Sequence, residues 1–242
     1  SDLEFIFNGK KKTLTEMLHI LTESKNGKER FKILSLINDG LKGTFAKYSA
    51  QTLYMVTGSK AVDNHERFYV HPMQSRNKSN RIPDSVVDNL HVAVEKVAGP
   101  LTQRYYRLKA RHLGLKVMNW SDRNAPMPFS DTSIVPFDEA MNIVLAAYGS
   151  FSPTLAGLIQ ENSMAKRIDA TVARHKRSGA FNYSVVLPGN LPASFTFLNY
   201  LGSNRDIMTL AHELGHGVHG LLAGKEQGSL MLGAPVTYCE TA

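Results

Sequence analysis

Apolar residues recur every three or four positions along most of the chain, the spacing typical of amphipathic helices. Residues 13–24 and 28–40 show this pattern, and Pro83-Asp84 opens a third such segment. We expect the apolar side chains of that third segment to pack in a core: Val86, Val87, Leu90, Val94 and Val97. Gly99-Pro100 should end or kink this helix before another helical run reaches Gly114. The pattern predicts a mainly α-helical fold.

The proline-rich segment Asn124–Phe129 interrupts the helical pattern and is the best candidate for a domain boundary. Beyond it, one helix is predicted from about Pro136 to Gly149. Another should run from Ser152-Pro153, a typical cap and first-turn pair, to about Arg167. The chain is therefore expected to form one large domain or two small ones.

Residues 181–187 differ from the rest because aromatic and β-branched residues dominate them. The turn residues of 188–192 then break the pattern before a second run of this kind at 195–200. These two runs predict a β-hairpin, which we expect to be the only strong hairpin in an otherwise helical chain.

Composition narrows the class of protein. The 242 residues are 43% hydrophobic, and 28 Lys and Arg against 21 Asp and Glu give a formal net charge of +7. The basic runs are short and lack zinc-finger or RNA-binding signatures, so we do not expect nucleic-acid binding. One cysteine, Cys239, excludes an internal disulfide, and no apolar stretch approaches the roughly 20 residues of a membrane helix. Without a recognisable secretion signal, a cytoplasmic location is the default expectation.

The chemistry lies on a helix predicted from Ser203 to Gly224, whose start carries an acidic capping box. His212 and His216 lie one turn apart, roughly 6 Å along the axis, so both imidazoles can reach one metal ion. Glu213 is rotated by about 100° and can contact a water molecule that the metal activates. Buried histidines with a purely structural role are the alternative. That alternative would place two histidines and a glutamate on one turn of an apolar helix without a chemical role.

A catalytic zinc usually takes three protein ligands, so a third is expected. The metzincin pattern fails, because His219 and Leu222 stand where that pattern needs glycine and histidine. The remaining downstream carboxylates are Glu226, in a segment that reads as a solvated loop, and Glu240, at the start of a possible helix. We favour Glu240, because a regular element holds a ligand more rigidly than a loop does.

Short motifs accompany this helix along the chain. In the second half they are Lys176–Phe181, Phe197–Tyr200, Asp206–His219 and Glu240-Thr241-Ala242; upstream they are Ser75–Asn80, Arg104–Ala110 and Asp122–Pro126. Together these segments, over roughly residues 65–242, resemble the catalytic region of the oligoendopeptidase F and thimet oligopeptidase family of zinc metallopeptidases, a gluzincin type.

The resemblance implies a mainly α-helical, zincin-like fold with a small β-hairpin beside the HExxH helix. Residues 1–125 would form a helical part of a channel wall, and 126–242 the start of the catalytic region. Carried over by position, His212, His216 and Glu240 become the ligands of one Zn²⁺ per chain, and Glu213 becomes the general base.

Other positions follow from the same reading. The edge of the hairpin could bind an extended peptide as an added strand. Phe195 and Phe197 are expected to pack in the core, and His219 either supports the metal ligands or packs.

The expected function is a zinc-dependent endopeptidase that hydrolyses short unfolded oligopeptides through a metal-activated water. An inactive metal-binding fragment or family member, an exopeptidase with the same ligands and a basic interaction module are the alternatives. In the family, the groups that stabilise the oxyanion follow the zinc glutamate at a distance. Because the sequence stops two residues after Glu240, we expect a fragment of a longer peptidase; the sequence leaves the oligomeric state open.

Overall fold

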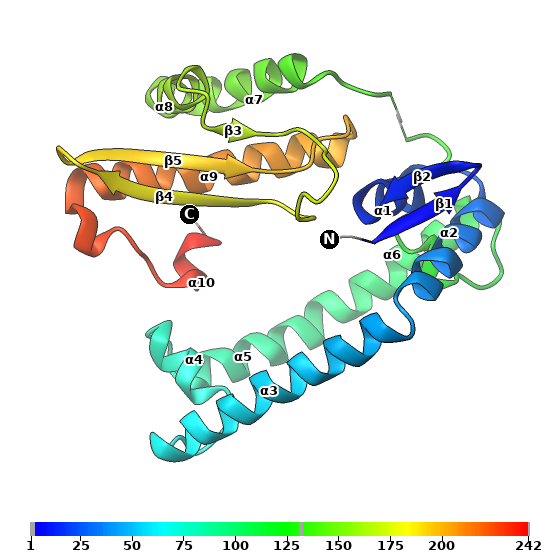
Figure 1. Cartoon of the computed structure of the whole chain (residues 1–242), viewed down its shortest axis with the longest axis horizontal. Helices are drawn as coiled ribbons and strands as arrows, with labels where there is room; N and C mark the ends of the chain where they lie inside the picture. Colours follow the sequence, from blue (N-terminus) through cyan, green and yellow to red (C-terminus); the bar gives the residue numbers. More distant parts are fainter. Residues whose placement is uncertain (1–2, 131–132, 242) are drawn as a thin grey trace. The chain divides into compact units, whose positions relative to one another are not determined.

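The computed structural model describes residues 3–130 and 133–241 (Figure 1). The contacts among these residues divide them into two compact units. Residues 24–129 form one, called the helical unit below; residues 3–23, 130 and 133–241 form the other, called the sheet unit. The predicted mainly α-helical fold is confirmed. The division into regions at residue 125 stays a prediction, and Ser1-Asp2 and Ala242 lie outside the described residues.

The helical unit consists of helices joined by short connections: α2 (Gly27–Gly40), α3 (Thr44–Glu66), α4 (Gln74–Ser79), α5 (Asp84–Ala93), α6 (Gly99–His112) and the short turn η2 (Trp120–Asp122). A π-helical turn, η1 (Val94–Ala98), joins α5 directly to α6. Of the two predicted outcomes at Gly99-Pro100, the end of the helix is therefore wrong, whereas the regular α-helical hydrogen bonding is interrupted by η1 directly before this pair. Pro100 lies in the first turn of α6, where its missing N–H group is tolerated.

A buried ion pair ties the ends of the helical unit together. Arg30 Nη2 on α2 lies 2.7 Å from Asp122 Oδ1 on η2, and both side chains are at most 5% exposed. Lys109 Nζ, on α6, donates to the carbonyl of Arg123 at 2.8 Å. Burial is the main cause that lowers the pKa of Lys109, with Arg30 adding to the effect and Asp122 opposing it. Two of the upstream motifs thus have a structural role.

The predicted core of α5 is not found. Val86, Leu90, Val94 and Val97 are exposed in the described part of the chain, and only Val87 is half-buried. Helical periodicity shows that one face of α5 is apolar, but it cannot show which element covers that face. None of the described helices combines the length and hydrophobicity needed to cross a bilayer.

The sheet unit carries these elements: β1 (Glu4–Phe7), β2 (Lys10–Thr13), α1 (Leu14–Glu23), α7 (Phe137–Phe151), α8 (Pro153–Met164), β3 (Ile168–Asp169), β4 (Phe181–Leu187), β5 (Leu191–Phe197), α9 (Asn204–Gln227), η3 (Ser229–Met231) and α10 (Val236–Cys239). The expectation of a single hairpin is wrong, because β1 and β2 form a second one. Its turn is Asn8-Gly9, with φ of 50° and 74°. Asn-Gly is a strong hairpin signal, since both residues tolerate positive φ.

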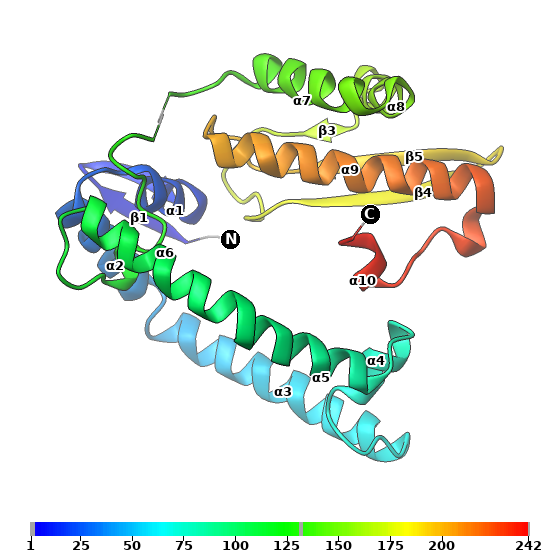
Figure 2. The same ribbon diagram turned by 180° about the vertical axis from the view of Figure 1, so that it is seen from behind.

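The predicted hairpin is confirmed as β4 and β5, which pair antiparallel from Phe181↔Phe197 to Leu187↔Leu191. The short β3 pairs parallel to β5 on the other side, so the strand order is β3-β5-β4 and β4 is an edge strand. Helix α9 runs along one face of this sheet, as the view from behind shows (Figure 2).

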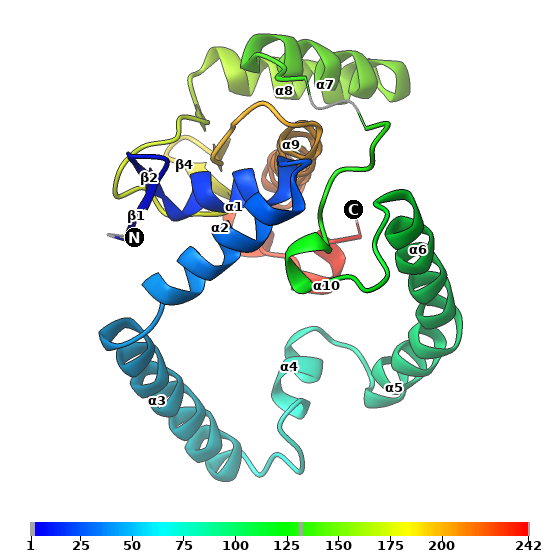
Figure 3. The same ribbon diagram turned by 90° about the vertical axis from the view of Figure 1, so that its right-hand side faces the viewer.

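Helices α7 and α8 pack beside each other and against α9 (Figure 3). The core of the sheet unit lies at this junction and consists of Ala140, Met141, Val144, Ile159, Leu198, Leu210, Leu214 and Val218.

Glycines set the distance between α9 and the sheet. Gly217, Gly220 and Gly224 lie at i, i+3 and i+7 on the face of α9 that meets β4 and β5. A β-carbon on Gly217 would lie 2.7 Å from Ser194 Oγ, and one on Gly220 would collide with the Ser184 side chain. The helix backbone therefore lies directly on the strands.

The sequence suggested that Pro192 ends the turn of residues 188–192. In the structure, Pro192 lies within β5 instead. The N–H groups of Thr196 and Leu198 donate to Arg167 and Asp169, on the side of β3. Because backbone groups alternate along a strand, the nitrogen of Pro192 points to the same side, away from β4. A proline at this position removes no hydrogen bond from the β4–β5 ladder.

The expected core packing of Phe195 is wrong, since this side chain is 43% exposed on the sheet face away from α9. Phe197, on the same face, is half-buried and stacks on Phe181 with ring centroids 4.7 Å apart. The small residues Ser194 and Thr196 fill the face that α9 covers. Strand alternation alone could not tell which of the two faces the helix would cover.

Gly220→Ala should destabilise the sheet unit by about 1–3 kcal/mol, because the added methyl group collides with Ser184. Gly157→Ala is the matched control: a β-carbon there, on α8, meets nothing within 4 Å. The control should be neutral or gain about 0.5–1 kcal/mol. Thermal unfolding followed by circular dichroism measures both. Equal stability of Gly220→Ala and wild type would show that α9 and β4 are farther apart.

Candidate metal centre

Helix α9 begins with the predicted capping box. The amide of Asp206 donates to Ser203 Oγ at 3.2 Å, and Asp206 Oδ2 accepts from the amides of Ser203 and Leu201 at 3.0 and 3.1 Å. These bonds satisfy N–H groups that a helix start leaves unpaired. They also fix which residues of α9 face the sheet and which face the opposite side.

Tyr148 of α7 holds the turn just before the HExxH residues. Its hydroxyl donates to the carbonyl of Ala211 at 3.0 Å, and burial raises its pKa. A β-carbon on Gly215 would lie 2.7 Å from that hydroxyl. The glycine inside the motif is therefore needed for this contact.

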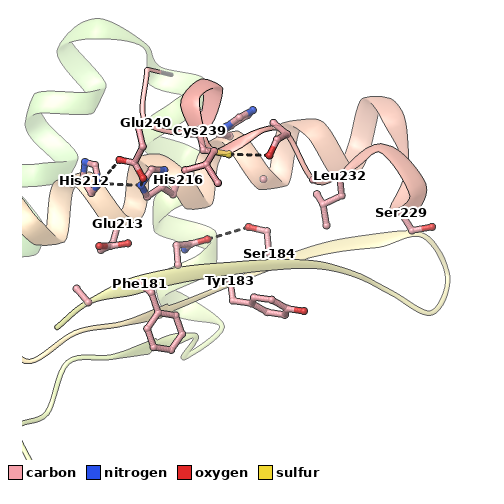
Figure 4. A pocket seen from close by; sticks show the side chains of 17 residues that line it. Phe181, Tyr183, Ser184, His212, Glu213, His216, Ser229, Leu232, Cys239 and Glu240 are labelled. Carbon is pink, nitrogen blue, oxygen red and sulfur yellow. Dashed lines mark hydrogen bonds and ion pairs between the residues drawn. The ribbon is translucent and has the colours of Figure 1, made fainter. Parts of the chain in front are cut away.

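His212, His216 and Glu240 converge at one point (Figure 4). The Nε2 atoms of the two histidines are 2.9 Å apart. Glu240 Oε2 lies 3.6 Å from His212 Nε2, and Glu240 Oε1 lies 3.8 Å from His216 Nε2. Two histidines on one helix and a glutamate 24 residues after the second histidine thus present two nitrogen donors and a carboxylate to the same point.

The spacing of these donors suits a metal ion. Two ligands each 2.0–2.1 Å from a tetrahedral zinc ion lie about 3.3 Å apart. The three observed separations, 2.9, 3.6 and 3.8 Å, fall on both sides of that value. Two imidazoles and a carboxylate are also one of the usual donor sets of catalytic zinc. The site can therefore hold such an ion.

Glu240 reaches this point from α10, a single turn at whose end it lies. Its amide donates to the carbonyl of Val236 at 3.1 Å, which fixes the backbone of the turn. The chain returns here from the end of α9 through residues 228–235. The carboxylate is therefore held at the end of the helical turn α10, and a helix does begin within residues 236–242, as we expected.

Glu226 is not brought to the site. It lies in the last turn of α9 and not in a loop, which corrects the prediction. Helix geometry places it about 21 Å along the axis from His212 and about 15 Å from His216. A side chain cannot span that distance, so the structure separates the two candidate carboxylates.

Glu213 lies beside the three donors without joining them. Its side chain is buried, and its Oε2 has no hydrogen-bond partner among the described residues. Burial is the main cause that raises the pKa of Glu213; His216 and His212 oppose it, and Glu240 adds to it. An unpartnered buried carboxylate oxygen is uncommon in a folded protein and points to a missing partner such as water.

A cleft of about 600 Å³ extends from the three donors along β4. His219 lines it but is not one of the converging donors, so its two predicted roles stay open. The other walls come from the N-terminal half of β4 and from residues 229–240. We call this space the metal-site cleft.

The free edge of β4 faces this cleft, and the backbone groups that point to it have no backbone partner in the described part of the chain. Since Thr196 bonds towards β3, its neighbours Phe195 and Phe197 bond towards β4, opposite Tyr183 and Phe181. The backbone groups of Asn182 and Ser184 therefore point to the free edge. Their side chains point to α9 instead, where Asn182 Nδ2 donates to Ser194 Oγ at 2.7 Å and to Thr196 Oγ1 at 3.0 Å.

Sequence reasoning did not identify Tyr148 or Asn182. Tyr148 contacts a carbonyl 63 residues away, a pairing that no local pattern encodes. Asn182 did carry a signal, because a polar residue among aromatic and β-branched neighbours needs a partner when it is buried.

The comparisons agree with this picture. Residues 158–242 match the model of peptidase family M3. Oligopeptidase PepF of Bacillus subtilis is 26% identical over 192 residues, which are 78% of this chain and 28% of the relative. Group B oligopeptidase PepB of Streptococcus agalactiae is 27% identical over 201 residues, 83% of this chain and 32% of the relative. The chain spans about a third of the length of these curated relatives.

Two solved structures share the fold. A Bacillus anthracis protein assigned as oligoendopeptidase F superposes with a TM-score of 0.85 at 17% identity, over 99% of this chain and 44% of that one. PZ peptidase A with an inhibitor gives a TM-score of 0.78 at 16% identity, over 91% and 39%. With the sequence relatives, they confirm the resemblance that the motifs predict.

We expect one zinc ion per chain, and His216→Ala or Glu240→Gln should abolish tight binding because each removes a donor. Glu226→Gln makes the same chemical change about 15 Å beyond His216 and should leave zinc binding unchanged. Elemental analysis of the dialysed proteins measures the zinc content. Equal zinc in wild type and in a His212→Ala, His216→Ala double variant would disprove the ligand assignment.

Proposed function

Because residues 158–242 match the model of peptidase family M3, we propose that this protein is a zinc-dependent endopeptidase of short unfolded oligopeptides. The observation that supports it most is the convergence of His212, His216 and Glu240 beside the buried carboxylate of Glu213.

His212, His216 and Glu240 are the proposed metal ligands. A zinc ion held by them would supply a Lewis acid that polarises the peptide carbonyl and lowers the pKa of a water molecule towards 7. The three side chains leave one side of the site open to the metal-site cleft. Substrate and water can therefore approach from that side.

Glu213 is the proposed general base. Its buried carboxylate lies beside the three donors, and its Oε2 has no partner among the described residues, so this oxygen can accept a proton from a water molecule at the site. It takes a proton from the water molecule as the water oxygen bonds to the carbonyl carbon of the substrate. When the carbon–nitrogen bond breaks, Glu213 gives this proton to the leaving amine, and the hydrolysis is balanced.

The free edge of β4 is the proposed binding site for the peptide backbone. Asn182 and Ser184 direct their backbone N–H and C=O groups to this edge, beside the metal ligands. An extended peptide can add there as another strand, which requires an unfolded substrate and depends little on its side chains. Backbone binding of this kind predicts a loose sequence preference.

A cytoplasmic location stays a prediction. It is supported by the presence of one cysteine, Cys239, which has no disulfide partner.

Glu213→Gln in the zinc-loaded protein should keep the metal and lose peptide hydrolysis by about 10² or more, because the amide cannot accept the proton. Glu226→Gln, on the same helix and far from the site, is the control and should keep both. Zinc content and peptide cleavage are measured on the same samples. Loss of zinc in Glu213→Gln would instead make Glu213 a ligand.

A short unfolded peptide should be cut internally, and a zinc chelator should stop the reaction. The same sequence placed inside a stably folded host protein should resist, because it cannot extend along β4, and should become cleavable once the host is unfolded. Mass spectrometry identifies the products. Digestion of the folded host would contradict the substrate class, and release of single terminal residues only would indicate an exopeptidase.

A further inference from the structure

A second cleft, of about 640 Å³, meets the metal-site cleft at the catalytic residues. Ala180, His212 and Glu213 line both clefts. The second one continues past the start of β4 towards the start of α9, where Arg205 forms part of its wall. We call it the Arg205 cleft. A peptide whose scissile bond lies at the metal site therefore has space on both sides.

Arg205 is an available cation in this cleft. It forms no hydrogen bond and no ion pair with any residue that the structure describes. Its neighbour Asp206 forms no ion pair with it; Asp206 Oδ2 instead accepts from the amides of Leu201 and Ser203 in the helix cap. Asn199, in the same wall, uses its Nδ2 to bind the carbonyls of Arg177 and Gly179 at 2.9 and 3.1 Å. The wall is thus held in place while the guanidinium stays available.

Arg205 lies at a defined distance from the metal ligands. It precedes His212 by seven residues, two turns of α9, so both lie on the same side of the helix about 10.5 Å apart along its axis. An extended peptide rises about 3.3 Å per residue, so about three residues span this distance.

The direction of a bound peptide follows from the strand edge. Antiparallel pairing is the commoner arrangement, and a peptide antiparallel to β4 runs from Ser184 towards Ala180. Its carboxyl-terminal part therefore enters the Arg205 cleft, and its amino-terminal part lies in the metal-site cleft. The positive charge of Arg205 therefore lies where it can attract a carboxylate in the carboxyl-terminal part of the peptide.

We propose that Arg205 binds a carboxylate of the substrate about three residues after the scissile bond. This proposal rests on the proposed peptidase function and deepens it. The carboxylate belongs either to the carboxyl terminus of the peptide or to an Asp or Glu side chain at that position. Guanidinium and carboxylate form paired, charge-assisted hydrogen bonds, which give both affinity and a fixed register.

The test compares matched peptides cleaved by the zinc-loaded protein. One pair has three residues after the scissile bond and ends in a free carboxylate or in a carboxamide. A second pair continues further, is amidated at its end, and carries Glu or Gln at the third position. In wild type, kcat/KM should be about 10-fold higher for the carboxylate member of at least one pair, and the pair that shows it identifies the source.

Arg205→Gln should remove this preference while the amide peptides are cleaved as before, and Arg205→Lys should keep part of it. Lys225→Gln is the control, because it removes an equal charge from the exposed far end of the same helix. It should leave the preference unchanged. Cleavage without any preference for a carboxylate, or a preference that survives in Arg205→Gln, would overturn the proposal and leave the peptidase function intact.

If no peptide is cut, a binding measurement separates the proposed carboxylate site at Arg205 from the proposed peptidase function. Fluorescence anisotropy of the same labelled peptides measures affinity without turnover. Tighter binding of the carboxylate members to wild type, lost in Arg205→Gln, would support the carboxylate site even where the proposed peptidase function fails. Equal affinity of wild type and Arg205→Gln for every peptide would refute it.

Discussion

The close contact between α9 and the β4–β5 hairpin determines the geometry of the whole site. Gly217, Gly220 and Gly224 remove side chains from one face of the helix, so its backbone rests on the strands. That contact sets the distance between the histidines on α9 and the free edge of β4. Tyr148 fixes the helix from the other side by binding Ala211. Donors and strand edge are thus held by regular elements, the arrangement that metal and substrate sites require for precision.

The parts of the site that sequence could predict are those encoded within one helix. Ser203 and Asp206 fix where α9 begins, and a spacing of four residues brings His212 and His216 together at any helix length. The choice between Glu226 and Glu240 depended on the extent of α9. Because the helix continues past Gly224, Glu226 is carried away from the site. Glu240 returns through a loop whose path no spacing rule gives.

The misjudged parts of the fold have a common cause, since pattern shows which residues are apolar but not what lies against them. The apolar face of α5 and the exposed Phe195 are examples. The β1–β2 hairpin is different, because Asn8-Gly9 is a local signal that could have been recognised. The buried pair of Arg30 and Asp122 joins residues 92 positions apart and could not have been found from local pattern.

Pro192 gives the two edges of the hairpin different properties. An unpaired edge attracts any extended chain, including another copy of the same protein, and so invites aggregation. On β5, the short β3 occupies part of the outer edge, and Pro192 offers no N–H donor on the remainder of that side. On β4, the edge keeps its donors and acceptors. Of these two edges, the one that stays open to an added strand is thus the edge that lies beside His212, Glu213 and His216.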